Sequence, residues 1–279
     1  MSIERKKAIK QIMGIVVLFM ALGAVKMWQD TQEKPNPKTN CYKHISGKMA
    51  ILIDKTDIIP LQTQTEIQNR AWDAIQEHSK MGDLISVYEI TQNSLQNLQP
   101  SFQMCRPKSG DDASELTENV KNINKKFKEQ FEKPLLNILS GNTGQAQNSP
   151  IAEAVSDINL SKNLRDAEYG RILLFSDLMQ YSSNVSTYGC KSPDDAINHF
   201  KQSRQGSSQR PTFNNTIVEL HIIPRPKMSE TEVACRDKFW LWFFGDMRGE
   251  PEKIRLIRND LPGSYGAIIS SKNQDDSNE

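Results

Sequence analysis

The stretch Met49-Ala-Ile-Leu-Ile-Asp-Lys-Thr-Asp57 decides the fold expected for this chain. Its apolar residues run without a break into an acidic turn that carries a hydroxyl, and a long amphipathic pattern follows. Such a continuous run is typical of a strand buried on both faces of a parallel sheet. Ligands of such sheets bind at the carboxyl ends of the strands. We therefore expect Asp54, Thr56 and Asp57 to lie at a ligand-binding edge.

A second stretch, Arg171-Ile-Leu-Leu-Phe-Ser-Asp177, has the same build, an apolar strand that ends in a hydroxyl and a carboxylate. Two strands that end in this way predict one shared site. Around them, strand-like and helix-like patterns alternate along most of the chain. This alternation indicates an α/β sandwich with a mostly parallel sheet and helices on both faces.

The local patterns give the expected elements. Strands are expected at 48–54, 83–90, 99–105, 170–176 and 216–223, with a last short element at 254–261. Helices are expected at 63–79, 115–139, 151–158, 193–203 and 230–245. The short spacing between the second and third strands favours an antiparallel hairpin.

Several helix details also follow from the sequence. Thr63 or Thr65 is the expected N-cap of the first of these helices, and Pro134 should kink or break the second. Ser149 is the expected N-cap of the third, with Pro150 at its first position. The aromatic residues at 239–244 have helical spacing, which predicts core packing or, alternatively, a stripe that faces a partner or membrane.

The N-terminus carries basic residues up to Lys10, followed by the apolar run Ile12–Val25. As a helix this run is about 21 Å long, whereas the hydrocarbon core of a bilayer is about 30 Å thick. The length matches a cleaved signal peptide, but Lys26 can snorkel and Trp28 can lie in the interfacial belt, as in an uncleaved anchor. A buried soluble helix is the third interpretation. Residues 12–28 are thus the expected membrane contact.

We divide the chain into an N-terminal membrane anchor (1–29), a polar linker (30–47), one globular domain (48–262) and a disordered tail (263–279). With the basic end in the cytosol, the domain would face the far side of the membrane. The expected location is a single-pass inner membrane protein with a periplasmic or extracellular domain.

Composition and motifs exclude several function classes. The net charge of +1 gives no electrostatic case for nucleic acid. The Ser46-Gly47-Lys48 and Ser140–Asn148 segments lack the features of a phosphate-binding loop, and no Gly-x-Ser-x-Gly elbow is present. The four histidines are far apart in sequence and have no metal-binding spacing.

The four cysteines are Cys41, Cys105, Cys190 and Cys235. No pair has CxxC spacing, which argues against a zinc site. An even number outside the cytosol indicates two disulfides. The alternative is four unpaired small core residues.

Three pieces occur in order: Asp54-Lys-Thr56-Asp-Ile58 after the first strand, Ser149-Pro150 before a middle helix, and Ser176-Asp177 after a later strand. Over residues 48–245 this order resembles the von Willebrand factor type A (VWA) domain with its metal-ion-dependent adhesion site. The resemblance implies a three-layer, Rossmann-like sandwich with one antiparallel edge strand.

The resemblance also implies a metal site. By position, Asp54, Thr56, Ser149 and Asp177 would hold a hard divalent cation, Mg²⁺ or Mn²⁺, in a shell of oxygens. Ile58 departs from the family pattern, because it stands where a second hydroxyl is expected, so that one ligand is missing. The alternative is structural, since Asp54 and Asp177 can cap loops and helix N-termini.

The family's sheet further implies a cysteine pairing. The end of the antiparallel strand would bring Cys105 to Cys41, and Cys190 and Cys235 would meet at the opposite end of the sheet.

We expect the chain to be a non-enzymatic, membrane-tethered module that binds another protein, of unidentified kind, at the carboxyl edge of its sheet. One alternative is a metal-dependent, phosphatase-like hydrolase with Asp54 as nucleophile or ligand. A phosphatase-like site, however, needs a second carboxylate two residues further on, where this chain has Thr56. A metal-free structural component of an envelope complex is the third interpretation.

Overall fold

The computed structural model describes residues 3–31, 33–94, 98–141, 144, 146–203, 211–213, 215–225, 227–245 and 255–262. It divides into two compact units, Met1–Asn36 and Pro37–Glu279, which we describe separately. The tail expected at 263–279 lies outside the described residues.

The first unit contains helix α1 (Ile3–Thr31). Its apolar side chains are largely exposed, among them Ile12 at 61% and Phe19 at 69%. The N-terminal run is thus helical. Within the described part of the chain, no helix has both the length and the apolar character needed to cross a membrane.

The second unit is built on a six-stranded sheet with the order β3-β2-β1-β4-β5-β6. The strands are β1 (Gly47–Asp54), β2 (Leu84–Ile90), β3 (Phe102–Cys105), β4 (Tyr169–Ser176), β5 (Thr216–Ile222) and β6 (Arg255–Asp260). Only the pairing of β2 with the edge strand β3 is antiparallel among these six. The expected mostly parallel sheet with one antiparallel edge strand is therefore confirmed.

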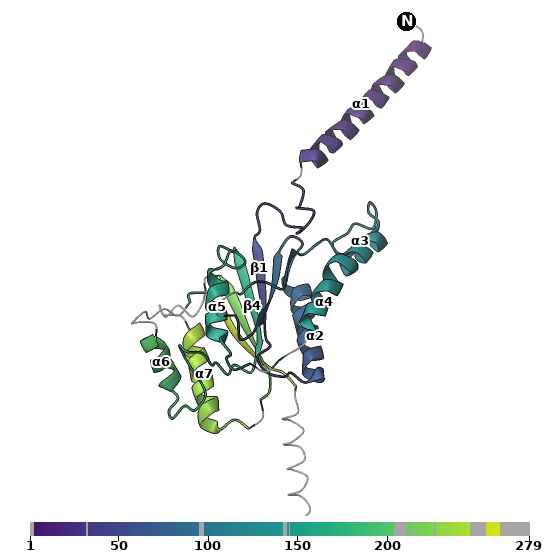
Figure 1. Cartoon of the computed structure of the whole chain (residues 1–279). Helices are drawn as coiled ribbons and strands as arrows, with labels where there is room; N and C mark the ends of the chain where they lie inside the picture. Colours follow the sequence, from purple (N-terminus) through teal and green to yellow (C-terminus); the bar gives the residue numbers. More distant parts are fainter. Residues whose placement is uncertain are drawn as a thin grey trace, which may run out of the picture. The chain divides into compact units, whose positions relative to one another are not determined.

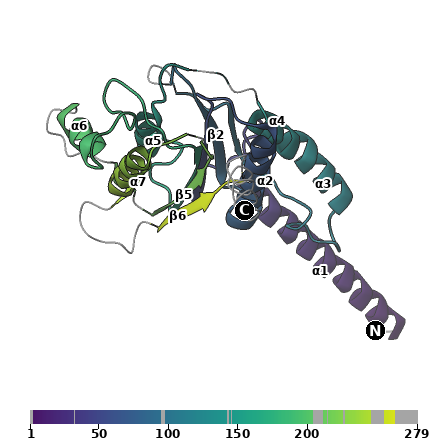
Figure 2. The ribbon, with the colours of Figure 1, turned by 90° about the horizontal axis from the view of Figure 1, so that it is seen from below.

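Helices cover both faces of this sheet. They are α2 (Leu61–His78), α3 (Val120–Phe127), the π-helical segment η1 (Lys128–Glu132), α4 (Lys133–Leu139), α5 (Ile151–Leu160), α6 (Asp195–Ser203) and α7 (Glu230–Phe244). Figures 1 and 2 show α2, α3 and α4 on one face and α5, α6 and α7 on the other. The result is three layers.

The central strand β1 explains why its sequence is continuously apolar. Ala50 and Leu52 belong to the core beneath α5 and α7, whereas Ile51 and Ile53 belong to the core beneath α2 and α4. Both sets of side chains are at most 1% exposed. Because successive side chains of a strand point to opposite faces, a strand between two helical layers needs an apolar residue at every position.

Several helix predictions need correction. Helix α2 begins at Leu61 after Pro60, with no side-chain cap, so neither Thr63 nor Thr65 is its N-cap. The helix expected at 115–139 begins at Val120 and passes through η1 into α4. By contrast, regular α-helix is interrupted by η1 directly before Pro134, which lies in the first turn of α4, in agreement with the expected kink or break.

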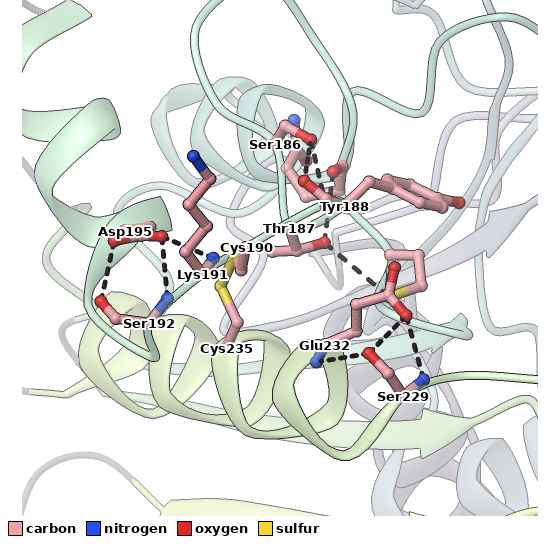
Figure 3. The surroundings of a disulfide bond; sticks show 12 residues. Ser186, Thr187, Tyr188, Cys190, Lys191, Ser192, Asp195, Ser229, Glu232 and Cys235 are labelled. Carbon is pink, nitrogen blue, oxygen red and sulfur yellow. Dashed lines mark hydrogen bonds between the residues drawn. A yellow bond between two sulfur atoms is a disulfide. The ribbon is translucent and has the colours of Figure 1, made fainter.

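Two disulfides use all four cysteines, with the expected pairing. Cys41–Cys105 joins the segment before β1 to the end of β3, and Cys190–Cys235 joins the loop after β4 to α7. In Figure 3 the second bond crosses from this loop to the first half of α7, where Ser229 and Glu232 form a capping box. The aromatic end of α7 is core, because Phe239, Trp240, Phe243 and Phe244 are buried.

Candidate functional site

The two acidic turns meet at one edge of the sheet. Strands β1 and β4 are parallel neighbours, with Ile53 paired to Phe175, so Asp54 lies beside Ser176. The Ser176 hydroxyl donates a hydrogen bond to Asp54 Oδ2 at 2.7 Å. We call this edge, where Asp54, Ser149, Asp177 and Arg225 lie, the carboxyl edge.

Asp54 is the centre of a buried hydrogen-bond cluster. Its Oδ1 accepts from the Thr56 backbone N–H at 3.1 Å and from the Thr56 hydroxyl at 2.6 Å. Its Oδ2 also accepts from the Ser149 hydroxyl at 3.3 Å. The Thr56 and Ser149 hydroxyl oxygens are 3.1 Å apart. Three of the four expected site residues therefore touch one another.

Ser149 reaches this cluster because its backbone is pinned to the loop after β4. It exchanges backbone hydrogen bonds with Tyr181, at 2.8 and 2.9 Å. Helix α5 begins two residues later, at Ile151, without a side-chain cap. The prediction that Ser149 caps this helix with Pro150 at its first position is therefore wrong. Gln180 Oε1 accepts from the Ala152 N–H at 2.8 Å instead.

Asp177, the fourth expected residue, divides its carboxylate between two partners. Oδ1 accepts from the Met179 N–H at 2.9 Å, and Oδ2 is bonded to the Arg225 guanidinium. Arg225 also bonds the Asp57 carboxylate and lies 5.3 Å from the centre of the Tyr188 ring. A single guanidinium thus joins the turns after β1, β4 and β5.

Asp54 differs from Asp57 and Asp177 in that its carboxylate accepts hydrogen bonds from neutral groups, whereas the other two are bonded to Arg225. Burial, followed by the nearby Asp177 carboxylate, raises the pKa of Asp54 to about 6. Lys55, although adjacent in sequence, is bonded to Glu89 on β2. Its ammonium group is therefore already paired on the neighbouring strand.

The backbone after Asp177 is strained and firmly held. Leu178 has a φ of 62°, a left-handed conformation that costs a non-glycine residue on the order of 1–2 kcal/mol. Its N–H donates to the Ser176 hydroxyl, and its carbonyl accepts from the Trp240 indole, both at 2.8 Å. These contacts fix the orientation of Asp177.

A buried carboxylate holds the rest of this loop. Glu153 on α5 accepts hydrogen bonds from Ser182 Oγ at 2.7 Å, Gln180 Nε2 at 3.0 Å and Asn184 Nδ2 at 3.1 Å. Glu153 is 6% exposed. The loop that carries Asp177 is therefore anchored to α5 as well as to α7.

Arg225 lines three hollows, and two of these also include Asp57. The first, of about 290 Å³, is lined by Asp54 and Asp177 together with Ile58, Ile59, Pro60, Ile223 and Pro224, and we call it the apolar hollow. The second, of about 380 Å³, is lined by Thr56, Ser149 and the side chains of Tyr181 and Tyr188, and we call it the tyrosine hollow. Arg225 and Asp57 line both.

The donor set fits a hard divalent cation in kind, because two carboxylates and two hydroxyls supply only oxygen. The mutual contacts of Asp54, Thr56 and Ser149 place three of these donors together. Within the described ranges, however, no group of three or more His, Cys, Asp or Glu is arranged for a metal. Ile58, where a further hydroxyl was expected, is 67% exposed.

Sequence reasoning assigned no role to Ser176 or Arg225. The signal for Ser176 was its position as the last residue of an apolar strand, directly before Asp177. The signal for Arg225 was a lone basic residue between two prolines at the end of a strand. Neither signal predicts which residues Ser176 and Arg225 bond, because these partners depend on which strand ends are neighbours in the sheet.

No protein-family model matches the chain, and no curated protein matches it. Among solved structures, the conserved hypothetical protein BatB from Bacteroides thetaiotaomicron is similar, with 10% identity over 85% of this chain and 100% of that chain and a TM-score of 0.32. An aerotolerance-related membrane protein from Bacteroides fragilis NCTC 9343, with multiple mutations to serines, is 10% identical over 83% of this chain and 98% of its own, at a TM-score of 0.32.

A mutant of the PilB minor pilin from Streptococcus sanguinis is 11% identical over 83% of this chain and 62% of that chain, at a TM-score of 0.38. At these scores the role of the carboxyl edge has to be argued from its own geometry. The fold is of the α/β class, and both acidic turns lie at the edge that the VWA resemblance implies.

Proposed function

We propose that this chain is a membrane-tethered, non-enzymatic, VWA-like module that binds another protein at the carboxyl edge. The observation that carries the proposal is the pair of exposed apolar side chains, Ile58 and Leu61, between the end of β1 and the start of α2. Ile58 lines the apolar hollow and is 67% exposed, and Leu61, at the start of α2, is 78% exposed. Large exposed apolar side chains that have charged groups around them are typical of a protein interface.

The residues around Ile58 indicate that its exposed side chain is part of a docking site. Asp57, with a side chain that is 53% exposed, and Arg225, at 28%, supply charged groups next to it. An apolar anchor surrounded by polar groups is the arrangement of many interface hot spots. The strained, firmly held Asp177 loop supplies a rigid wall.

The tether is proposed for α1. Side chains from Ile12 to Ala24 are uncharged and exposed on this helix, and basic residues precede them. Insertion with the basic end in the cytosol places the second unit on the far side of the membrane. The two disulfides support this side, because disulfides persist in oxidising compartments.

A phosphatase-like hydrolase is less well supported. The residue two positions after Asp54 is Thr56, whose hydroxyl donates to Asp54 rather than adding a second carboxylate. Asp57 is bonded to Arg225. An Asp54 nucleophile would have to act while its oxygens accept hydrogen bonds from Thr56, Ser149 and Ser176.

A divalent cation, Mg²⁺ or Mn²⁺, is proposed as an additional constituent of the carboxyl edge. Asp54, Thr56, Ser149 and Asp177 would hold it. Bound there, the cation would add positive charge beside the carboxylates of Asp54 and Asp177. It would also offer a coordination position to a carboxylate of the partner.

The test is co-purification from native membranes with the full chain. Ile58→Asp puts a charge into the apolar hollow, so we expect it to lose a partner that the natural chain retains. Leu160→Asp is the matched control, because Leu160 is also 67% exposed. It is the last residue of α5, before the segment that leads to the start of β4, and does not line either hollow. Equal recovery of every protein with the two variants would overturn the proposal and favour an inert scaffold.

A further inference from the structure

Arg225 places its guanidinium between two carboxylates of the carboxyl edge. One nitrogen, Nη1, bonds the carboxylates of both Asp57 and Asp177. The guanidinium carbon lies 5.3 Å from the centre of the Tyr188 ring. Charge-assisted hydrogen bonds and a cation–π contact together hold the side chain in place.

The two oxygens of the Asp177 carboxylate have different partners. Oδ1 accepts from the Met179 N–H, and Oδ2 is bonded to the Arg225 guanidinium. Two positive groups on one carboxylate oxygen repel each other strongly at close range. A metal ion held by Oδ2 would therefore compete with Arg225 for the same atom.

The charges at this edge are the reason why a divalent cation would be favoured over the monovalent guanidinium. The carboxylates of Asp57 and Asp177 share the Arg225 guanidinium, whereas Lys55 is bonded to Glu89. The buried Arg236 guanidinium donates to the Asp177 backbone carbonyl at 3.3 Å, not to its carboxylate. Asp54 receives hydrogen bonds from neutral groups but no direct ion pair. Two of these carboxylates thus share one monovalent group, and among the described residues the third has no cation bonded to it.

We infer that Arg225 is a built-in cation that competes with a divalent metal ion for Asp177, and that metal binding releases Arg225 between the two hollows. This inference rests on the cation proposed above and concerns the regulation of the docking site. Because Arg225 lines both the apolar hollow and the tyrosine hollow, its release changes the wall that a partner meets.

The prolines on both sides of Arg225 in the sequence restrict the backbone that carries its side chain. Pro224 precedes it and Pro226 follows it. Proline fixes its own φ and restricts the residue before it to extended conformations. The backbone therefore has little freedom to lose when the guanidinium pairs with the two carboxylates, which makes Arg225 an effective internal competitor.

The experiment is calorimetric titration of the full chain in detergent with Mn²⁺ and with Mg²⁺. Arg225→Met keeps an unbranched stem of similar length to the aliphatic part of arginine and removes the guanidinium and its charge. We expect it to bind Mn²⁺ at least tenfold more tightly than the natural chain. Arg225→Lys keeps a monovalent cation without the planar fork, so its affinity should lie between the two. Asp177→Asn in the Arg225→Met background should abolish the gain.

Arg258→Met is the matched control. It also removes one positive charge, but Arg258 pairs with Asp237 and Asp260 at the end of β6. Its Mn²⁺ affinity should equal that of the natural chain. The inference is overturned if Arg225→Met binds Mn²⁺ no more tightly than the natural chain, if neither binds it, or if Arg258→Met gains equally. None of these results touches the co-purification test, so failure here is distinct from failure of the docking proposal.

Discussion

At the scale of the residue, burial shifts the pKa values of two side chains in opposite directions. Asp54 is buried among hydroxyls, and its carboxyl has a raised pKa. His221 on β5 stacks on Phe175 with ring centres 4.4 Å apart, and burial, followed by the Arg70 charge, lowers its pKa to about 4. Both shifts follow from the cost of a charge inside a protein. They make opposite contributions to the pH dependence of stability.

The contribution of His221 has a definite sign. In the unfolded chain the imidazole takes up a proton near its ordinary pKa of 6.5, whereas in the folded protein it does so only near 4. The stabilising contribution is thus fully present above pH 6.5 and is lost as the pH falls toward 4. Glu219 Oε2 lies 3.5 Å from His221 Nε2, and Arg171 in turn pairs with Glu219.

The prediction is that His221→Phe flattens this dependence. The natural chain should lose up to about 3 kcal/mol more free energy of unfolding between pH 6.5 and 4 than the variant does. Urea unfolding at a series of pH values measures it. His199→Phe, at an exposed position on α6, is the control and should behave as the natural chain. Identical pH profiles for the natural chain and His221→Phe would refute the assignment.

The sequence predicted much of the site at this scale. Asp54 and Asp177 end apolar runs that must be central strands, so their approach followed from the pattern of the strands. Arg225 could not be paired in advance, because its two carboxylates come from the ends of two other strands. Ser149 was assigned to the right cluster by the resemblance, whereas the local helix-start rule gave it the wrong capping role.

At the scale of the element, the loop after β4 is the part of the fold that positions the site. Its contacts come from α5 through Glu153 and from α7 through Trp240 and the Cys190–Cys235 bond. In Figure 3, Tyr188 and Cys190 lie on this same loop, so the disulfide holds the segment that contacts Arg225. A rigid loop of this kind suits a binding surface.

Glu153→Ala should destabilise the domain by about 3 kcal/mol or more, because Ser182, Gln180 and Asn184 would keep buried donors without an acceptor. Glu153→Gln retains one acceptor oxygen and should cost less. Urea unfolding at pH 7 measures both. Glu129→Ala, at an exposed position in η1, is the control and should change stability by less than about 0.5 kcal/mol. An equally small effect for Glu153→Ala would contradict this account of the loop.

The Cys41–Cys105 bond spans 64 residues, which corresponds to about 4 kcal/mol in the chain-entropy model of disulfide stabilisation. The double variant Cys41→Ser/Cys105→Ser should lose about that much free energy of unfolding. Reductant should then lower its midpoint less than it lowers that of the natural chain. The bond does not stabilise the fold if the double variant has the same unfolding midpoint as the natural chain and if reductant changes neither midpoint.

Strand patterns were more reliable than helix ends in this chain. A strand between two helical layers has to be apolar at every position, and β1 and β4 show this plainly. The start of a helix depends on which groups happen to satisfy its first N–H groups. For α5 this group is Gln180, from the loop after β4, and local sequence does not reveal such a partner.

At the scale of the whole molecule, an apolar helix and an α/β domain form two units of one chain. The proposed tether predicts that deletion of residues 1–31 moves the protein from the membrane fraction to the aqueous fraction, because the exposed apolar side chains of α1 are lost. Fractionation with a high-salt wash, followed by immunoblotting, measures this. A full chain that stays in the aqueous fraction would contradict the tether.

The central claim is that the carboxyl edge, and Ile58 in particular, meets another protein. The most direct measurement is photo-cross-linking of the full chain in its native membranes, with a photo-reactive amino acid at position 58 or at position 160. The account predicts a discrete cross-linked product from position 58 and none from position 160. A product from position 160 alone, the same products from both, or none from either would contradict it.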